Sequence, residues 1–162
     1  MTKRRRAYIR AGRILSPVAL LGLRIYTMIT HRPRVRVIVT NEYDEILLVR
    51  GIISHLGWWM LPGGGVNRGE ELVVAAQREL HEETGIHKSL DNFHYIRTIE
   101  KSELGFNFSA PLFRILVKKS DLPKSLYNPV EIAEIGWYKL DKLPELTAAV
   151  VFLAIDELSA VN

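Results

Sequence analysis

Alternating and clustered apolar residues along the chain predict strands joined to a few helices. Residues 34–40 (RVRVIVT) alternate polar and apolar side chains, which is typical of a half-buried strand. Residues 41–44 supply turn chemistry, and residues 45–50 (EILLVR) are predicted to be the returning strand of a hairpin. Other apolar runs predict a short extended piece at 58–61, two longer strands at 93–100 and 106–118 joined by a turn at Leu104-Gly105, and a last strand at 135–140.

Two segments have the composition of helices. Residues 70–84 contain no glycine or proline and are rich in residues that favour helix, and Gly85 is the usual kind of residue to end one. Within this segment Val73, Ala76 and Leu80 form an apolar stripe that can dock on a sheet. Residues 146–158 predict a C-terminal helix. Strands mixed with such helices indicate an α/β fold with helices packed on a mixed sheet.

The N-terminal segment stands apart from this pattern. Residues 14–29 are mostly apolar, but they are too few to span a bilayer and Arg24 interrupts them. Residues 5–10 loosely resemble a twin-arginine export signal, yet no small-residue cleavage site follows the apolar run. We therefore expect a helix that packs on the domain, ahead of one lying on a membrane surface. The predicted units are a basic arm with an apolar helix over residues 1–31 and a globular domain over residues 32–162.

Composition and charge limit the kind of chemistry. The chain of 162 residues has no cysteine, which excludes disulfides, thiolate metal sites and cysteine nucleophiles and fits a reducing cytoplasm. Residues 1–36 hold ten Lys and Arg and no acidic residue, so of the 22 basic and 18 acidic residues the remainder keeps 12 and 18. Such a basic arm suits peripheral contact with anionic lipids or nucleic-acid phosphates, and a solvated tail explains it equally well.

Residues 63–86 (GGGVNRGEELVVAAQRELHEETGI) are the most informative about chemistry. Glu79, Glu82 and Glu83 are spaced so that all three carboxylates share one helix face. Alone, they are best explained as a solvated acidic face. The preceding glycine run changes that balance, because such a loop lets the backbone approach a ligand and often leads into a helix that handles phosphate. Hard divalent cations prefer oxygen ligands of this kind near phosphates.

Loop and helix together match every defined position of the Nudix box, G-x5-E-x7-R-E-U-x-E-E-x-G-U, where U is aliphatic. The matching residues are Gly64, Glu70, Arg78, Glu79, Leu80, Glu82, Glu83, Gly85 and Ile86. The chain therefore resembles the Nudix hydrolases, sharply over residues 63–86 and more loosely over 34–145. This resemblance implies an α/β/α sandwich with a mixed central sheet. Residues 58–65 (WWMLPGGG) are similar to both ADP-ribose and nucleoside-triphosphate hydrolases of that family and do not choose between them.

The resemblance implies a metal site and its supporting residues. Mg²⁺, with Mn²⁺ as a possible substitute, would be bound by the carboxylates of Glu79, Glu82 and Glu83 and by the carbonyl of Gly63. Glu70 and Arg78 would pair and orient these carboxylates, an indirect role that matters for metal affinity. A bound metal would neutralise a diphosphate and activate water, and a carboxylate would take the proton of that water.

The identity of that general base stays open. The candidates are Glu82 and Glu79 in the box and Glu131, which begins a stretch (131–137, EIAEIGW) that resembles a pattern found before the last strand of many family members. Glu134 is the second choice in that stretch and is as readily explained as a surface charge on a loop.

Substrate contacts are expected outside the helix. Arg50, Gly64 and Gly65 are candidates to meet phosphates, and Trp59 and Phe108 are candidates to stack a base. For each aromatic residue a place in the core is the commoner outcome. The expected reaction is hydrolysis of a diphosphate linkage in a nucleoside diphosphate-linked compound or a nucleoside triphosphate.

Two further expectations concern function and assembly. The alternative function is a non-catalytic Nudix domain that senses a nucleotide and regulates a partner, and the intact set of box carboxylates favours the enzyme. The apolar N-terminal helix is suited to a homodimer interface, whereas no stable partner of another kind is expected.

Overall fold

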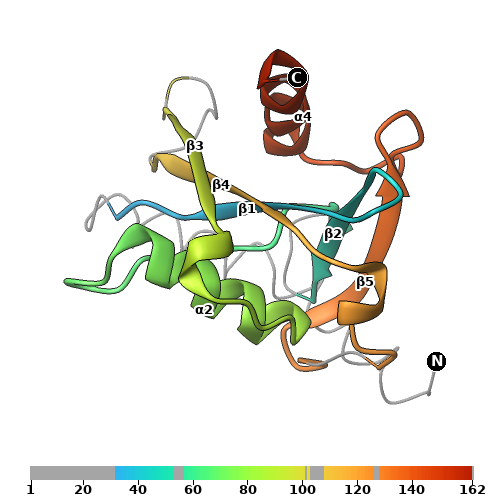
Figure 1. Ribbon diagram of the computed structural model, residues 1–162, viewed down its shortest axis with the longest axis horizontal. Helices are drawn as coiled ribbons and strands as arrows, with labels where there is room; N and C mark the ends of the chain where they lie inside the picture. The colour runs from blue at the N-terminus through green and yellow to red at the C-terminus, as the bar shows by residue number, and fades with distance from the viewer. Residues whose placement is uncertain (1–31, 53–56, 101, 103–107, 126–127, 162) are drawn as a thin grey trace.

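The computed structural model describes residues 32–52, 57–100, 102, 108–125 and 128–161, and within these residues five strands form one mixed sheet (Figure 1). The strand order is β3-β4-β1-β2-β5, with β1 parallel to β4 and the other neighbours antiparallel. The elements are β1 (Arg36–Thr40), β2 (Glu45–Gly51), α2 (Leu72–Thr84), η2 (Leu90–Asn92), β3 (His94–Ile99), β4 (Ala110–Leu116), η3 (Lys119–Asp121), β5 (Ile132–Lys139) and α4 (Ala149–Val161).

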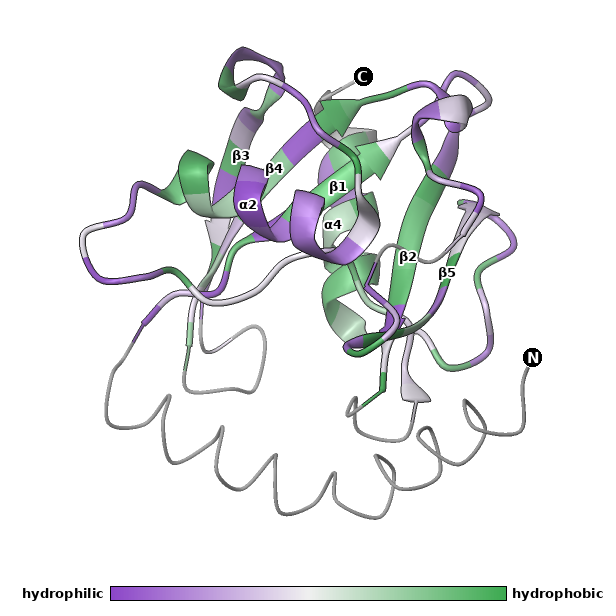
Figure 2. Cartoon of the chain, turned by 90° about the horizontal axis from the view of Figure 1, so that it is seen from below, coloured by the Kyte–Doolittle hydropathy of each residue, from purple (hydrophilic) through white to green (hydrophobic). Residues whose placement is uncertain are grey.

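Helices cover both faces of this sheet, which confirms the predicted α/β/α sandwich. Helix α2 lies on one face and α4 on the other (Figure 1). Val35, Val37 and Val39 belong to the core cluster that includes α2, whereas Ile38 belongs to the cluster that includes α4. The period of two along residues 34–40 therefore produced the two-sided strand that it predicts. Figure 2 shows the hydrophobic residues concentrated along the strands.

Residues 60–62, which lead into the glycine loop, lie between the diverging ends of β1 and β2. The register of these strands pairs Thr40 with Ile46, next to their connecting turn. Farther along, Val49 and Met60 exchange two backbone hydrogen bonds of 2.9 Å, and the carbonyl of Pro62 accepts a bond of 2.9 Å from the N–H of Val37. The chain that follows Met60 thus runs beside the start of β1.

Helix α2 matches its prediction closely. It begins two residues after the predicted start, and Glu70 stays outside it. Gly85 ends the helix with a φ of 77°, and its N–H donates to the carbonyl of His81 at 2.8 Å. Ala76 and Leu80 of the predicted stripe are buried, and Val73 packs against them while half-buried.

Other boundaries differ because long-range contacts decide them. Strand β4 begins only at Ala110, and the Ser109 carbonyl just before it accepts a hydrogen bond from Arg34 N–H; residues 106 and 107 of the predicted strand lie outside the described part. Strand β5 begins earlier than predicted, because Ile132 and Ala133 are buried, so Glu134 lies in a strand and not on a loop.

The C-terminal helix begins later than predicted because the residues before it form other bonds. The backbone groups of Leu146 and Ala148 both pair with Trp59, at 2.7 and 2.9 Å, and so hold this segment extended. These bonds attach residues 146–148, just before α4, to Trp59 in the segment that leads into the glycine loop. Helix α4 therefore starts at Ala149.

The predicted helix over residues 1–31 lies outside the described residues. Arg36, the last residue of the expected basic arm, is only 4% exposed and forms the first position of β1, so it does not belong to a solvated tail. Across the described ranges no helix is both long and apolar enough to cross a membrane.

Candidate active site

Two glycines bring the loop backbone against the carboxylates of α2. Gly63 has a φ of 139°, and its N–H donates to Glu83 Oε2 at 2.9 Å. At Gly64, a Cβ would fall 2.4 Å from Glu79 Oε2, so the carboxylate of Glu79 occupies the space that a side chain would need. These close approaches require glycine, and they bring the carboxylates of Glu79 and Glu83 against the backbone of the same two loop residues.

Arg78 clamps the loop to the helix. Its guanidinium donates to both carboxylate oxygens of Glu70, at 2.8 and 2.9 Å, and to the carbonyl of Gly65 at 2.9 Å. It also donates to Glu79 Oε1 at 2.9 Å and to Glu82 Oε2 at 3.2 Å. The bond from Arg78 holds the pKa of Glu70 below its ordinary value. The structure thus brings together the pair that the Nudix resemblance implied, in a fork geometry that fixes orientation.

Glu83 is the most strongly perturbed carboxyl of the cluster. Loss of hydration raises its pKa from 4.5 to about 7, and the negative charges of Glu79 and Glu131 act in the same direction. The hydrogen bond from Gly63 N–H and the charge of Arg36 oppose this rise. Glu131 therefore lies near enough to influence Glu83, although 48 positions separate them in the sequence. Carboxylates from two distant segments converge here, as active sites often require.

This perturbation predicts how pH acts on the metal-free protein. Folded Glu83 keeps its proton up to about pH 7, whereas the unfolded chain releases it near 4.5. The stabilising contribution is therefore complete below pH 4.5 and is lost as pH rises to about 7. We expect the free energy of unfolding in EDTA to lose up to about 3 kcal/mol over this range. Urea titrations at several pH values measure it; Glu83→Gln should flatten the profile, and an unchanged slope in that variant would contradict the assignment.

Glu131 and Glu82 differ in their surroundings. The carbonyl of Glu131 accepts from Ile52 N–H at 2.7 Å, which anchors its segment beside the end of β2, and its carboxylate accepts from Asn128 Nδ2 at 3.0 Å. The side chain of Glu82 is 49% exposed and contacts Arg78. Both side chains are therefore exposed; Glu131 lies near enough for its charge to act on Glu83, whereas Glu82 contacts the Arg78 clamp.

The expected substrate residues Arg50 and Trp59 are engaged elsewhere. Arg50 forms an ion pair with Glu134, and its guanidinium lies 5.3 Å from the ring centre of Trp59. Trp59 is buried and meets Tyr138 edge-on with ring centres 5.0 Å apart. Trp59 therefore has the core place that was its commoner alternative and offers no free face for a base. The register of β2 and β5 places Arg50 opposite Glu134, which allows this ion pair.

A cationic pocket beside the cluster was missed by sequence reasoning. It has a volume of about 210 Å³ and is lined by Arg32, Pro33, Arg34, Gly65, Val66, Asn67, Arg78 and Glu79. The Arg34 guanidinium lies 5.8 Å from the ring centre of Phe108, which is half-buried. The signal was present: alternation over residues 34–40 puts Arg34 and Arg36 on one face of the strand.

The loop glycines predict a separation of activity from stability. In Gly64→Ala, the new methyl group must displace the mobile carboxylate of Glu79 and not any backbone, so folding should be nearly unaffected. We expect kcat/KM to fall by about a hundredfold, the usual effect of misplacing a reacting group by about 1 Å. Gly69→Ala is the control from the same loop, because a Cβ there would meet nothing within 4 Å and Gly69 has no proposed part in binding. Similar activity losses in both variants would refute this explanation.

The donor set suits a hard divalent cation. Glu79 and Glu83 offer carboxylate oxygens on either side of the Gly63–Gly64 backbone, and oxygen ligands are what Mg²⁺ prefers. Across the described residues, no group of three or more His, Asp or Glu side chains already has the spacing to hold a metal ion. The carbonyl oxygen of Gly63, the further ligand implied by the resemblance, accepts a hydrogen bond of 2.6 Å from Arg36 Nη1. The carboxylates of Glu79 and Glu83 therefore fit a divalent cation in their chemistry, while Arg36 engages the Gly63 carbonyl that would be a further ligand.

This chain is similar to several proteins named RNA pyrophosphohydrolase. An RNA pyrophosphohydrolase from Novosphingobium aromaticivorans is 28% identical over 137 residues, which cover 72% of this chain and 82% of the relative. An RNA pyrophosphohydrolase from Erythrobacter litoralis is 30% identical over 126 residues, which cover 68% of this chain and 77% of the relative. Each alignment spans most of both proteins.

Solved structures agree with the fold. A MutT NUDIX hydrolase from Burkholderia pseudomallei superposes with a TM-score of 0.67 at 23% identity, covering 78% of this chain and 97% of that one. An ADP-ribose pyrophosphatase from Streptococcus suis gives 0.60 at 21% identity, covering 82% and 94%. The family model described as NUDIX domain matches residues 30–154. With the complete box on its loop and helix, this chain belongs to the Nudix hydrolase family.

Proposed function

We propose that this enzyme hydrolyses a diphosphate linkage in a nucleotide-type substrate by attack of water on phosphorus, with Mg²⁺ as the cofactor and Mn²⁺ as a substitute. The observation that carries this proposal is the convergence of Glu79 and Glu83 on the Gly63–Gly64 backbone. The intact clamp from Arg78 to Glu70 supports it, because it orients the carboxylates. Family membership and the pyrophosphohydrolase names of the relatives support the reaction type.

Glu79 and Glu83 would hold the metal ion, with Glu82 able to join them from the solvent edge. When bound, the ion would neutralise the diphosphate, polarise a phosphoryl oxygen and lower the pKa of a coordinated water. Glu131 is the proposed base, since its charge acts on Glu83 and its carboxylate is exposed to water while it accepts a hydrogen bond from the Asn128 side chain. Glu82 and Glu79 are the alternative bases.

The cationic pocket suits the phosphate groups of the substrate. Arg32, Arg34 and Arg78 line it, and Glu79 lies at the same pocket, so anionic groups bound there would adjoin the carboxylate cluster. Gly65 also lines this pocket, and Phe108 lies under the Arg34 guanidinium. Gly64, Gly65 and Phe108 therefore remain proposed substrate contacts, whereas Arg50 and Trp59 do not.

A hydrolysis panel tests the proposal. It would compare RNA with a 5′-polyphosphate end, because the curated relatives are RNA pyrophosphohydrolases, with ADP-ribose, other nucleoside diphosphate sugars, dinucleoside polyphosphates and (d)NTPs. We expect turnover of one class with Mg²⁺ and none in EDTA. Equal rates with and without EDTA would contradict the metal role. A protein that is inert with Mg²⁺ and Mn²⁺ yet binds a nucleotide would favour the sensing function.

Two predictions about assembly stay open to direct measurement. Binding of anionic membranes or nucleic acid through residues 1–36 should weaken with added salt and disappear when residues 1–13 are deleted. A homodimer would appear as a doubled mass in sedimentation analysis of the full chain.

A further inference from the structure

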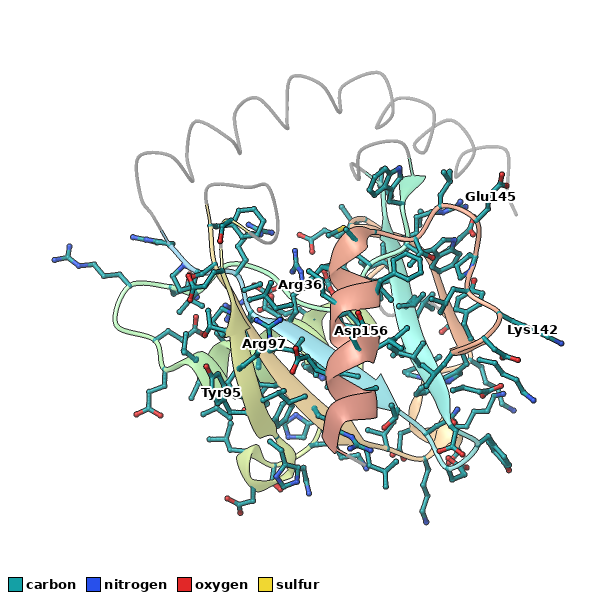
Figure 3. All side chains as sticks on the ribbon, turned by 90° about the horizontal axis from the view of Figure 1, so that it is seen from above. Arg36, Tyr95, Arg97, Lys142, Glu145 and Asp156 are labelled. Carbon is teal, nitrogen blue, oxygen red and sulfur yellow. The ribbon has the colours of Figure 1, made fainter. Side chains whose placement is uncertain are left out.

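Arg36 places a buried positive charge inside the acidic site. Its side chain leaves the first residue of β1, whose position Figure 3 labels, and the residue is 4% exposed. Nη1 donates to the carbonyl of Gly63 at 2.6 Å and to that of Val35 at 3.2 Å. The carboxylates of Glu83 and Glu79 attract this charge, and burial and Arg34 oppose it. A guanidinium out of water needs such compensation.

The backbone of Gly63 links this cation to a carboxyl group. Its N–H donates to Glu83 Oε2 at 2.9 Å, and its carbonyl accepts from Arg36. This residue packs closely on the chain at the start of β1, because a Cβ on Gly63 would lie 2.2 Å from the carbonyl oxygen of Val35 and 3.0 Å from the Cα of Arg36. Arg36, Gly63 and Glu83 therefore form a row, with the guanidinium at one end and the carboxyl group of Glu83 at the other.

We propose that Arg36 is a built-in competitor of the divalent cation: it balances the carboxylates of Glu79 and Glu83 and occupies the carbonyl of Gly63 until a metal ion binds. This inference rests on the proposed metal-dependent function. A cation that approaches the two carboxylates meets a like charge held beside them. It also finds the Gly63 carbonyl engaged by a hydrogen bond. Arg36 thereby sets the metal affinity of the site at a lower value than its carboxylates alone would give.

A purely structural role for Arg36 predicts the opposite sign. If Arg36 only held the loop in place, its loss would loosen Gly63 and Glu83 and weaken metal binding. If it competes, its loss removes repulsion from the site and strengthens binding. The direction of the change therefore separates the two roles, and no measurement of activity is needed.

The experiment measures binding of Mn²⁺ to the full chain without nucleotide, by the electron paramagnetic resonance signal of free Mn²⁺. The variants are Arg36→Gln, which is neutral but keeps a donor for the Gly63 carbonyl, and Arg36→Met, which removes the donor as well. Arg114→Met is the charge-matched control, because Arg114 is half-buried in β4 and lines a different pocket. We expect both Arg36 variants to bind Mn²⁺ at least about tenfold more tightly, and the control to stay within about twofold of wild type.

Thermal unfolding adds a second readout. Arg36→Gln should lower the melting temperature more in EDTA than in saturating Mn²⁺, because the ion takes over the balance of charge. Equal or weaker Mn²⁺ binding by folded Arg36→Gln overturns the inference, and this variant decides the matter if Arg36→Met does not fold. If Mn²⁺ binding by Arg36→Gln is equal or weaker while wild type hydrolyses a substrate of the panel, the inference about Arg36 fails and the proposed function stands. If wild type and variants bind no Mn²⁺ and wild type hydrolyses nothing, the proposed function fails with it.

Discussion

Replacing Glu83 by glutamine should lower kcat by about a thousandfold or more, the largest effect on activity that we expect from one substitution. Glu83 is the carboxyl on which the site converges: it accepts from Gly63 N–H, and the charges of Arg36, Glu79 and Glu131 all act on it. Glutamine keeps the size of the side chain but removes the negative charge that would hold a cation. The measurement is steady-state hydrolysis of the substrate found in the panel, at saturating Mg²⁺.

Two matched substitutions make this result specific. Glu71→Gln removes the same charge from an exposed residue just before α2 and should leave kcat within about twofold of wild type, as surface changes usually do. Glu82→Gln should fall between the two, because the Glu82 side chain is 49% exposed and lies at the edge of the cluster. An active Glu83→Gln enzyme that still needs Mg²⁺ would show that other groups hold the ion.

Replacing Gly63 by alanine should destabilise the whole domain by about 3 kcal/mol or more. The added Cβ would lie 2.2 Å from the carbonyl oxygen of Val35, and a backbone atom directly before the central strand β1 cannot move aside as a side chain can. The φ of 139° adds strain for any residue with a side chain. Urea unfolding followed by circular dichroism would measure the loss.

Gly69→Ala is the control for the conformational part of this cost. Gly69 also has a positive φ, of 76°, but a Cβ there would meet nothing within 4 Å. We expect a loss of only about 1 kcal/mol, the ordinary cost of the left-handed conformation. If Gly63→Ala were no less stable than Gly69→Ala, the close approach of the loop to β1 would not be the constraint that we infer.

These predictions separate what each loop glycine does. Gly63 is required for the backbone to pass β1, whereas Gly64 leaves room for the carboxylate of Glu79. A loss of stability is therefore expected at the first position and a loss of activity at the second. The Nudix box pattern defines only Gly64, and the structure adds the reason why Gly63 beside it matters.

Much of the fold could be predicted from the sequence because it depends on local periodicity. Alternation over residues 34–40 and the apolar stripe of residues 70–84 each report which side of an element is buried, and neighbouring residues alone determine that pattern. The glycine at 85 ends its helix through its own φ of 77°, which is also a local property. The box residues were recognisable for a related reason, since the loop and its helix are contiguous in the chain.

The tertiary structure decided what depends on residues far apart in the sequence. Arg36 was counted with the basic arm and expected at a polar position of a half-buried strand, yet β1 lies in the middle of the sheet and buries it against the loop of Gly63. Arg50 was expected to face phosphates, yet pairing of β2 with β5 sets it against Glu134. No local pattern could specify either contact, because each follows from strand order and register.

The acidic site itself divides in the same way. The sequence by itself determined which carboxylates share one face of α2, because residues spaced three and four apart are neighbours on any helix. Only the tertiary structure decided that Glu131 and Arg36 reach Glu83, and that Glu82 stays at the solvent edge. The physical reason is that helical spacing is a property of the backbone alone, whereas burial and charge at Glu83 come from segments that only the packed sheet brings together.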